Sequence, residues 1–140
     1  MRAKVKRPNP AKAKKYFESK LAFTMGPADL KYFMDEGEVP NIIDVREEKD
    51  FESGHIPGAV NVPYEQWKTT KLLSKKKVNV VYCYTAICHL SARAALYFSA
   101  KGYPVIELEG GIEGWKDYEY EIEKGSAPQL KQATESKKAA

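Results

Sequence analysis

Cysteine is scarce in this sequence, and long apolar runs are missing. Only two cysteines occur among the 140 residues, Cys83 and Cys88, too few for the disulfide framework of a small secreted protein. Two thiols are also too few for a structural zinc site, so we expect no metal and no cofactor. No segment reaches the roughly 20 apolar residues of a membrane span, and the first 20 residues lack the apolar part of a secretory signal. We therefore expect a cytoplasmic protein with no membrane partner.

Charge is unevenly spread along the chain. Residues 1–20 hold eight Lys or Arg and one Glu, residues 124–140 hold four Lys and one Glu, and the stretch between them holds 11 basic and 17 acidic residues. This pattern divides the chain into a basic, partly helical N-terminal arm (1–20), an acidic folded domain (21–123) and a flexible C-terminal tail (124–140). A basic arm can bind nucleic acid, but a solvated terminus is the simpler interpretation, and we expect no nucleic-acid partner.

Hydrophobic patterns predict helices and strands in alternation. We expect strands over 41–45, 78–82 and 104–108, and helices over 11–21, 27–37, 47–52, 64–73, 90–101 and 112–117. Tyr16, Phe17 and Leu21 would form the apolar side of the first helix, and Trp67 and Trp115 would lie in the core. Short apolar runs of this kind are typical of buried parallel strands. The alternation predicts an α/β fold, with a central, mostly parallel sheet and helices on both faces.

Cys83 directly follows the strand predicted over 78–82, and Asp44 lies near the end of the strand over 41–45. Ligands in open α/β sheets bind beyond the carboxyl ends of the strands. Loop amides and the first N–H groups of the next helix would face Cys83, lower the pKa of its thiol and hold an anion or the outer sulfur of a persulfide. A small buried side chain that merely ends the strand is the alternative interpretation.

Three segments, in the same order, resemble those of rhodanese-like domains: IDVRE at 43–47 with FESGHIPGAVNVP at 51–63, VVYC at 80–83, and LEGGIEGW at 108–115. The resemblance covers about residues 22–118 and implies the three-layer rhodanese-like fold. It also implies a sulfurtransferase whose sulfur-accepting nucleophile is Cys83. The resemblance assigns the active-site loop to Tyr84, Thr85, Ala86, Ile87, His89 and Leu90, and structural support to Asp44, Arg46 and His55.

The loop departs from the family pattern at its charged position. Family loops carry glycine three residues after the cysteine and Arg or Lys five residues after it, whereas this chain has Ala86 and Cys88 there. If the loop is two residues longer, the basic position falls on Leu90, and Arg93 lies inside the predicted helix. A cation would help bind the thiosulfate dianion, so its absence leaves thiosulfate open as a donor. His89 stands where cysteine-dependent phosphatases and arsenate reductases have arginine, which argues against those activities.

Cys88 is a candidate second thiol. It could attack a persulfide on Cys83 and release sulfide as an internal disulfide forms, or it could take over the sulfur. A small apolar residue that anchors the loop is the alternative.

The leading hypothesis is a rhodanese-type sulfurtransferase or sulfur carrier that moves sulfane sulfur through a Cys83 persulfide. Its donor would be thiosulfate, a polysulfide or a low-molecular-weight persulfide, and its acceptor a thiol, cyanide or another protein. Two alternatives remain: a thiol–disulfide redox protein that uses Cys83 and Cys88, and a non-catalytic interaction module on the same fold.

Overall fold

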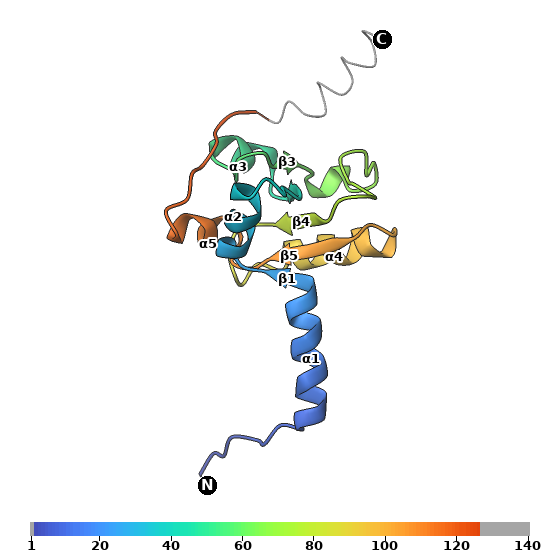
Figure 1. The fold of residues 1–140 in the computed structure, drawn as a ribbon, viewed down its shortest axis with the longest axis vertical. Coiled ribbons are helices and arrows are strands. Elements are labelled where there is room, and N and C mark those ends of the chain that lie inside the picture. The colour runs from blue at the N-terminus through green and yellow to red at the C-terminus, as the bar shows by residue number, and fades with distance from the viewer. Residues whose placement is uncertain (1, 127–140) are drawn as a thin grey trace.

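The structure, a computed structural model, describes residues 2–126; residues 127–140 of the predicted C-terminal tail lie outside the described part. Within residues 2–126, five parallel strands form one sheet in the order β1-β5-β4-β2-β3 (Figure 1). The strands are β1 (Thr24–Met25), β2 (Asn41–Asp44), β3 (Val60–Asn61), β4 (Asn79–Tyr82) and β5 (Val105–Leu108). The predicted α/β class with a parallel sheet is confirmed.

Helices cover both faces of this sheet. They are α1 (Pro10–Phe23), α2 (Pro27–Asp35), α3 (Glu48–Ser53), the 3₁₀ turn η1 (Tyr64–Gln66), α4 (Leu90–Ala100) and α5 (Gly111–Asp117). Leu30 of α2, Phe51 of α3 and Trp115 of α5 share one core cluster. Phe98 of α4 and Trp67 pack in a second cluster. The result is the three-layer arrangement expected for the family.

The central strand β4 contributes side chains to both core clusters, which explains why apolar residues follow one another in its sequence. Successive side chains of a strand point to opposite faces of the sheet. Val80 and Tyr82 belong to the cluster with α2, α3 and α5, whereas Val81 and the next residue, Cys83, belong to the cluster with α4. Every residue of β4 is buried, as expected of a parallel strand covered on both faces.

Two edge strands were not predicted, and one predicted helix is wrong. β1 and β3 have two residues each, too few to produce a recognisable alternation. The helix expected over 64–73 is reduced to η1, because Thr70 adopts a positive φ of 46° that ends helical geometry. This turn lets Leu72 and Leu73 pack against the second cluster. Trp67 is buried as predicted, and its indole N–H donates to the carbonyl of Val62.

Helix α1 forms as predicted but leaves its apolar side uncovered. It projects from the domain (Figure 1) and contacts it at β1 and β5. The side chains of Tyr16, Phe17 and Leu21 are 62%, 54% and 79% exposed, because only the end of the helix reaches the sheet. No helix in residues 2–126 is long and apolar enough to cross a membrane. Since α1 runs on to Phe23, it continues past residue 20, where the sequence pattern divides arm from domain.

Candidate active site

The carboxyl ends of β2 and β4 place Asp44 and Cys83 at the same edge of the sheet. Asp44 pairs with Tyr82 in the register of the two strands, and Cys83 is the next residue along the chain. A loop then leads to Leu90, the first residue of α4. Both predicted positions therefore lie where parallel sheets bind their ligands.

Asp44 and Arg46 form a buried ion pair that shapes the β2 end of this edge. The guanidinium Nη2 of Arg46 lies 2.8 Å from Asp44 Oδ2, and it also donates to the carbonyl of Gly54 at 2.6 Å. The backbone N–H of Arg46 donates to the same carboxylate. Burial lowers the pKa of Arg46, but the hydrogen bond and charge of Asp44 outweigh it and raise that pKa. These contacts hold the strand end and the start of the Gly54 turn together.

His55 occupies a buried position on the side of α3. Its ring stacks on Phe51 with centroids 3.7 Å apart, and Nδ1 lies 2.8 Å from the Phe51 carbonyl oxygen. Its backbone exchanges two hydrogen bonds with Glu123. His55 thus fastens the 54–58 turn and the 118–126 segment to the domain, and its ring contacts point to packing rather than to proton transfer at a cysteine.

The Cys83 thiol lies beneath the loop. The residue is 1% exposed, and its Sγ lies 3.4 Å from the hydroxyl of Ser91 and 3.7 Å from the backbone oxygen of Cys88. Burial raises the pKa of Cys83, and its hydrogen bond with the Cys88 side chain raises it further. Hydrogen bonds with Ser91 act in the opposite direction but are outweighed. The predicted lowering of the Cys83 pKa is therefore wrong, because burial has the larger effect.

The amide contacts predicted for Cys83 are divided between the two cysteines: the backbone N–H of Ser91 faces Cys83, whereas those of Tyr84, Thr85 and Leu90 face Cys88. Burial alone would raise the pKa of this half-buried thiol. The hydrogen bond with the Cys83 side chain and the backbone N–H groups of Leu90, Tyr84 and Thr85 outweigh burial and lower it. A lowered pKa and partial exposure are the properties of a nucleophilic cysteine. The two thiols thus differ in burial and in the direction of their pKa shifts.

Ser91 connects Cys83 to a carboxylate on the neighbouring strand. The Sγ atom of Cys83 lies 3.4 Å from Ser91 Oγ, within hydrogen-bond distance, and the Ser91 hydroxyl donates to Oε2 of Glu107 at 2.7 Å. Ser91 is buried in the first turn of α4, and Glu107 lies on β5. The hydrogen bond to Glu107 fixes the orientation of the Ser91 hydroxyl beside the buried thiol.

A cavity of about 300 Å³ opens beside Cys88. Its lining residues come from the loop, α4, β5, the turn after β5 and α1: Lys20, Thr85, Ala86, Cys88, Ser91, Glu107, Leu108, Glu109 and Gly110. Lys20 lies 3.6 Å from Glu109 across the cavity wall. The sequence did not identify Lys20 or Glu107 as site residues, because neither lies in the loop motif. The packing of α1 and α4 against β5 brings both residues to the cavity.

The remaining loop residues take different positions. Thr85 and Ala86 line the cavity, whereas Ile87 is 89% exposed and His89 is also exposed. Leu90 begins α4 and packs against the second core cluster.

Tyr84, assigned to the active-site loop, directs its hydroxyl to α3, where it donates to Asp50 at 2.6 Å. Burial and that hydrogen bond raise the pKa of Tyr84 to about 12. Tyr84 does not line the cavity beside Cys88.

The start of α5 closes over the loop from the other side. The backbone N–H groups of Ile112 and Glu113 donate to the carbonyls of Cys83 and Tyr84. Gly111 has a φ of +60°, and a Cβ there would lie 2.7 Å from the Cys83 oxygen. Only glycine permits so close an approach, so Gly111 positions the loop that carries both thiols.

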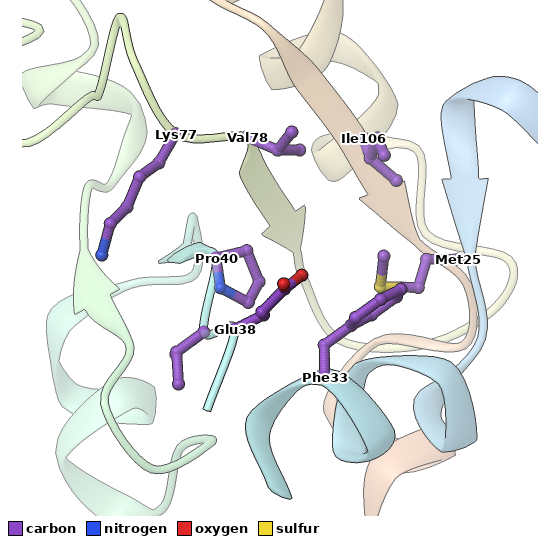
Figure 2. Close-up of a pocket in the computed structure, with 8 residues that line it drawn as sticks. Met25, Phe33, Glu38, Pro40, Lys77, Val78 and Ile106 are labelled. Atoms are coloured by element: carbon purple, nitrogen blue, oxygen red, sulfur yellow. The ribbon is translucent and has the colours of Figure 1, made fainter. Parts of the chain in front are cut away.

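A second, apolar cavity of about 370 Å³ lies at the opposite edge of the sheet (Figure 2). Phe33 of α2, Pro40 before β2 and Val78 before β4 are among its lining residues, and neither thiol is. Among residues 2–126, no group of three His, Cys, Asp or Glu side chains is placed to hold a metal ion.

Comparisons with known proteins agree with this geometry. The chain is 32% identical over 88 residues to the thiosulfate sulfurtransferase GlpE of Shewanella oneidensis, a match that covers 60% of this chain and 83% of GlpE. It is 40% identical over 76 residues to the uncharacterized protein YqhL of Bacillus subtilis, covering 53% of this chain and 59% of YqhL. The crystal structure of BH2092 from Bacillus halodurans superposes with a TM-score of 0.76 at 35% identity, covering 83% of this chain and 87% of BH2092.

Several curated relatives are longer proteins, and this chain spans 24–59% of their lengths. Some relatives are named as sulfurtransferases or sulfur carriers, and another is named as a transcriptional regulator. The family model of the rhodanese-like domain matches residues 26–118. This range includes four of the five strands, β2 to β5, and begins just after β1. A parallel sheet with a cysteine at the end of its central strand, matched over more than half of the chain, places this protein in the rhodanese-like domain family.

Proposed function

We propose that this protein is a sulfurtransferase or sulfur carrier that moves sulfane sulfur through persulfides on Cys88 and Cys83. The observation that carries the proposal is the placement of two free cysteines around one loop: the Sγ atom of buried Cys83 lies 3.7 Å from the backbone oxygen of Cys88, and Cys88 lines the adjacent cavity. The pKa of Cys88 is lowered and the pKa of Cys83 is raised. Membership in a family with named sulfurtransferases and sulfur carriers supports the same chemistry.

Sulfur enters at Cys88. The Cys88 thiolate attacks the sulfane sulfur of the donor, a new S–S bond forms, and the bond between that sulfur and the rest of the donor breaks. The donor fragment leaves with the electron pair, for example as a thiolate or as sulfite. Cys88 suits this step because it lines the cavity and its pKa is lowered, whereas Cys83 is buried.

Sulfur then passes to Cys83. Cys83 attacks the outer sulfur of the Cys88 persulfide, the bond from that sulfur to Cys88 breaks, and the proton of the Cys83 thiol moves to Cys88. The thiol with the lower pKa is the better leaving group, so this direction is favoured. The Cys83 persulfide predicted from the sequence is the stored form, protected by burial.

Release follows the same path in reverse. The sulfur returns to Cys88, and a thiol, cyanide or an acceptor protein attacks it from the cavity. A cytoplasmic location suits this chemistry, since free thiols persist in reducing compartments.

Intact-mass measurement tests the function. Wild-type protein is incubated separately with thiosulfate, a polysulfide and glutathione persulfide. We expect at least one donor to add one sulfur atom, which dithiothreitol removes. The Cys83→Ser/Cys88→Ser double variant should gain none. The proposal would be rejected if no donor added sulfur to the wild-type protein, or if the double variant gained as much sulfur as the wild type.

A thiol–disulfide redox function is the second candidate, because both cysteines are free and the Sγ atom of Cys83 lies 3.7 Å from the backbone oxygen of Cys88. Mild oxidation would then remove two hydrogen atoms from the mass and link the peptides that contain Cys83 and Cys88. If this disulfide forms reversibly with a defined reduction potential while no donor loads sulfur, the redox function replaces the sulfur-transfer function.

A further inference from the structure

Charge in the cavity beside Cys88 differs from what a thiosulfate site needs. Two carboxylates, Glu107 and Glu109, and one ammonium group, Lys20, line it. Lys20 and Glu109 lie 3.6 Å apart and neutralise each other. Glu107 accepts a hydrogen bond from Ser91, and among residues 2–126 no cation lies within ion-pair distance of it. The cavity lining therefore holds one more carboxylate than it holds ammonium groups.

Other basic groups near the loop do not reverse this sign. Arg93 is exposed on α4 and does not line the cavity, and His89 is exposed on the loop and does not line it either. Lys20 is already engaged with Glu109. A donor with two negative charges would enter against the field of Glu107, whereas a donor with an ammonium group would be attracted by it.

We propose that this cavity selects sulfane-sulfur donors that carry an ammonium group, namely persulfides of aminothiols, over anionic donors such as thiosulfate. Glu107 receives the ammonium group while the persulfide sulfur reaches Cys88. The Cys88 thiolate attacks the outer sulfur, and the aminothiol leaves as its thiolate, still carrying its ammonium group. This inference rests on the proposed sulfur-transfer function and specifies the substrate class of the same site.

Three matched donors test the selection: 2-aminoethyl, 2-hydroxyethyl and 2-carboxyethyl persulfide. They share the reactive S–S group and a two-carbon chain but differ in charge. The loading rate of the protein with each donor is divided by the rate of that donor with a free small thiol, which corrects for intrinsic reactivity. We expect the cationic donor to exceed the anionic donor by about fivefold, as partly exposed charge pairs allow. The ratio should fall towards one in high salt.

Two variants should move this ratio in opposite directions. Glu107→Gln keeps an acceptor for Ser91 but removes the charge, so the ratio should fall towards one. Lys20→Gln removes the competing cation, so the ratio should rise. Glu65→Gln, an equal change in net charge outside the cavity, should leave it unchanged. Because each ratio compares donors on one protein, a general loss of thiol reactivity cancels.

An anionic donor that loads as fast as the cationic one, or a ratio unchanged by Glu107→Gln, would overturn the selection while leaving sulfur transfer intact. No loading by any donor would overturn the proposed function and this selection with it.

Discussion

The Sγ atom of Cys83 lies 3.7 Å from the backbone oxygen of Cys88, so the two cysteines occupy one site. Burial raises the pKa of the Cys83 thiol, and the Cys88 side chain raises it further, whereas the Cys83 side chain and backbone N–H groups lower the pKa of Cys88 against its own burial. Cys88 is thus suited to attack a sulfur donor, and the buried Cys83 is suited to hold the sulfur. The five-residue spacing matters because it places Cys83 at the end of β4 and Cys88 on the loop that covers Cys83.

Alkylation should distinguish the two thiols by pH. A lowered pKa means that the thiolate is already present at a lower pH, so Cys88 should react with iodoacetamide at a pH where Cys83 does not. Peptide mapping over a pH series measures both rates. Cys83→Ala removes the hydrogen-bond partner and should shift the Cys88 profile to higher pH, whereas Cys83→Ser should shift it less. Equal profiles for Cys83 and Cys88 in the wild type would refute the assignment.

Ser91 should matter to Cys83 and not to Cys88. Ser91→Ala removes hydrogen bonding that lowers the pKa of Cys83, so alkylation of Cys83 should move to higher pH. It should also lower the free energy of unfolding by about 1 kcal/mol, the typical value of one hydrogen bond. Ser91→Thr keeps the hydroxyl and serves as the control. A shift in the Cys88 profile alone would contradict this assignment.

Gly111 should be essential for the position of the loop. In Gly111→Ala the new Cβ meets the Cys83 carbonyl at 2.7 Å with φ at +60°, which should cost about 1–3 kcal/mol of unfolding free energy and slow sulfur loading. Gly114→Ala is the matched control, since its Cβ would meet the Glu109 oxygen at an ordinary 3.5 Å. Urea unfolding of both variants provides the comparison. Equal unfolding free energies for Gly111→Ala and Gly114→Ala would show that the loop can move to accommodate the Cβ of residue 111 without loss of stability.

Removing one member of the Asp44–Arg46 ion pair should lower the free energy of unfolding more than removing both members. Arg46→Met removes the charged partner of the buried Asp44 carboxylate, although the backbone N–H of residue 46 still donates to it, and should destabilise the domain by about 3–5 kcal/mol. The double variant Asp44→Leu/Arg46→Met removes both charges and should unfold at a higher urea concentration than Arg46→Met. A double variant no more stable than the single one would show that the pair itself is not the source of the loss.

Local sequence patterns predicted the elements that form the site's frame. The apolar runs at 41–45 and 78–82 correspond to β2 and β4, and the strand end at Cys83 followed directly from the second run. The turn at Thr70 was missed because a positive φ at a threonine has no composition signal.

The chemistry around the thiols was harder to predict, because it depends on contacts distant in sequence. Lys20 reaches the cavity through the end of α1, and Glu107 reaches it from β5. The loop N–H groups face Cys88 rather than Cys83 because the loop folds over the buried thiol. A motif shows which residues follow a strand, but it does not show which sulfur the loop leaves accessible.

The order in which sulfur occupies the two thiols is the most direct measurement. Wild-type protein is mixed with a persulfide donor, quenched by alkylation at short intervals and mapped by peptide mass. Sulfur should appear first on Cys88 and then on Cys83, should stay on Cys88 in Cys83→Ser, and should load far more slowly in Cys88→Ser. Sulfur that appears first on Cys83, with Cys88→Ser loading at the wild-type rate, would contradict entry through Cys88.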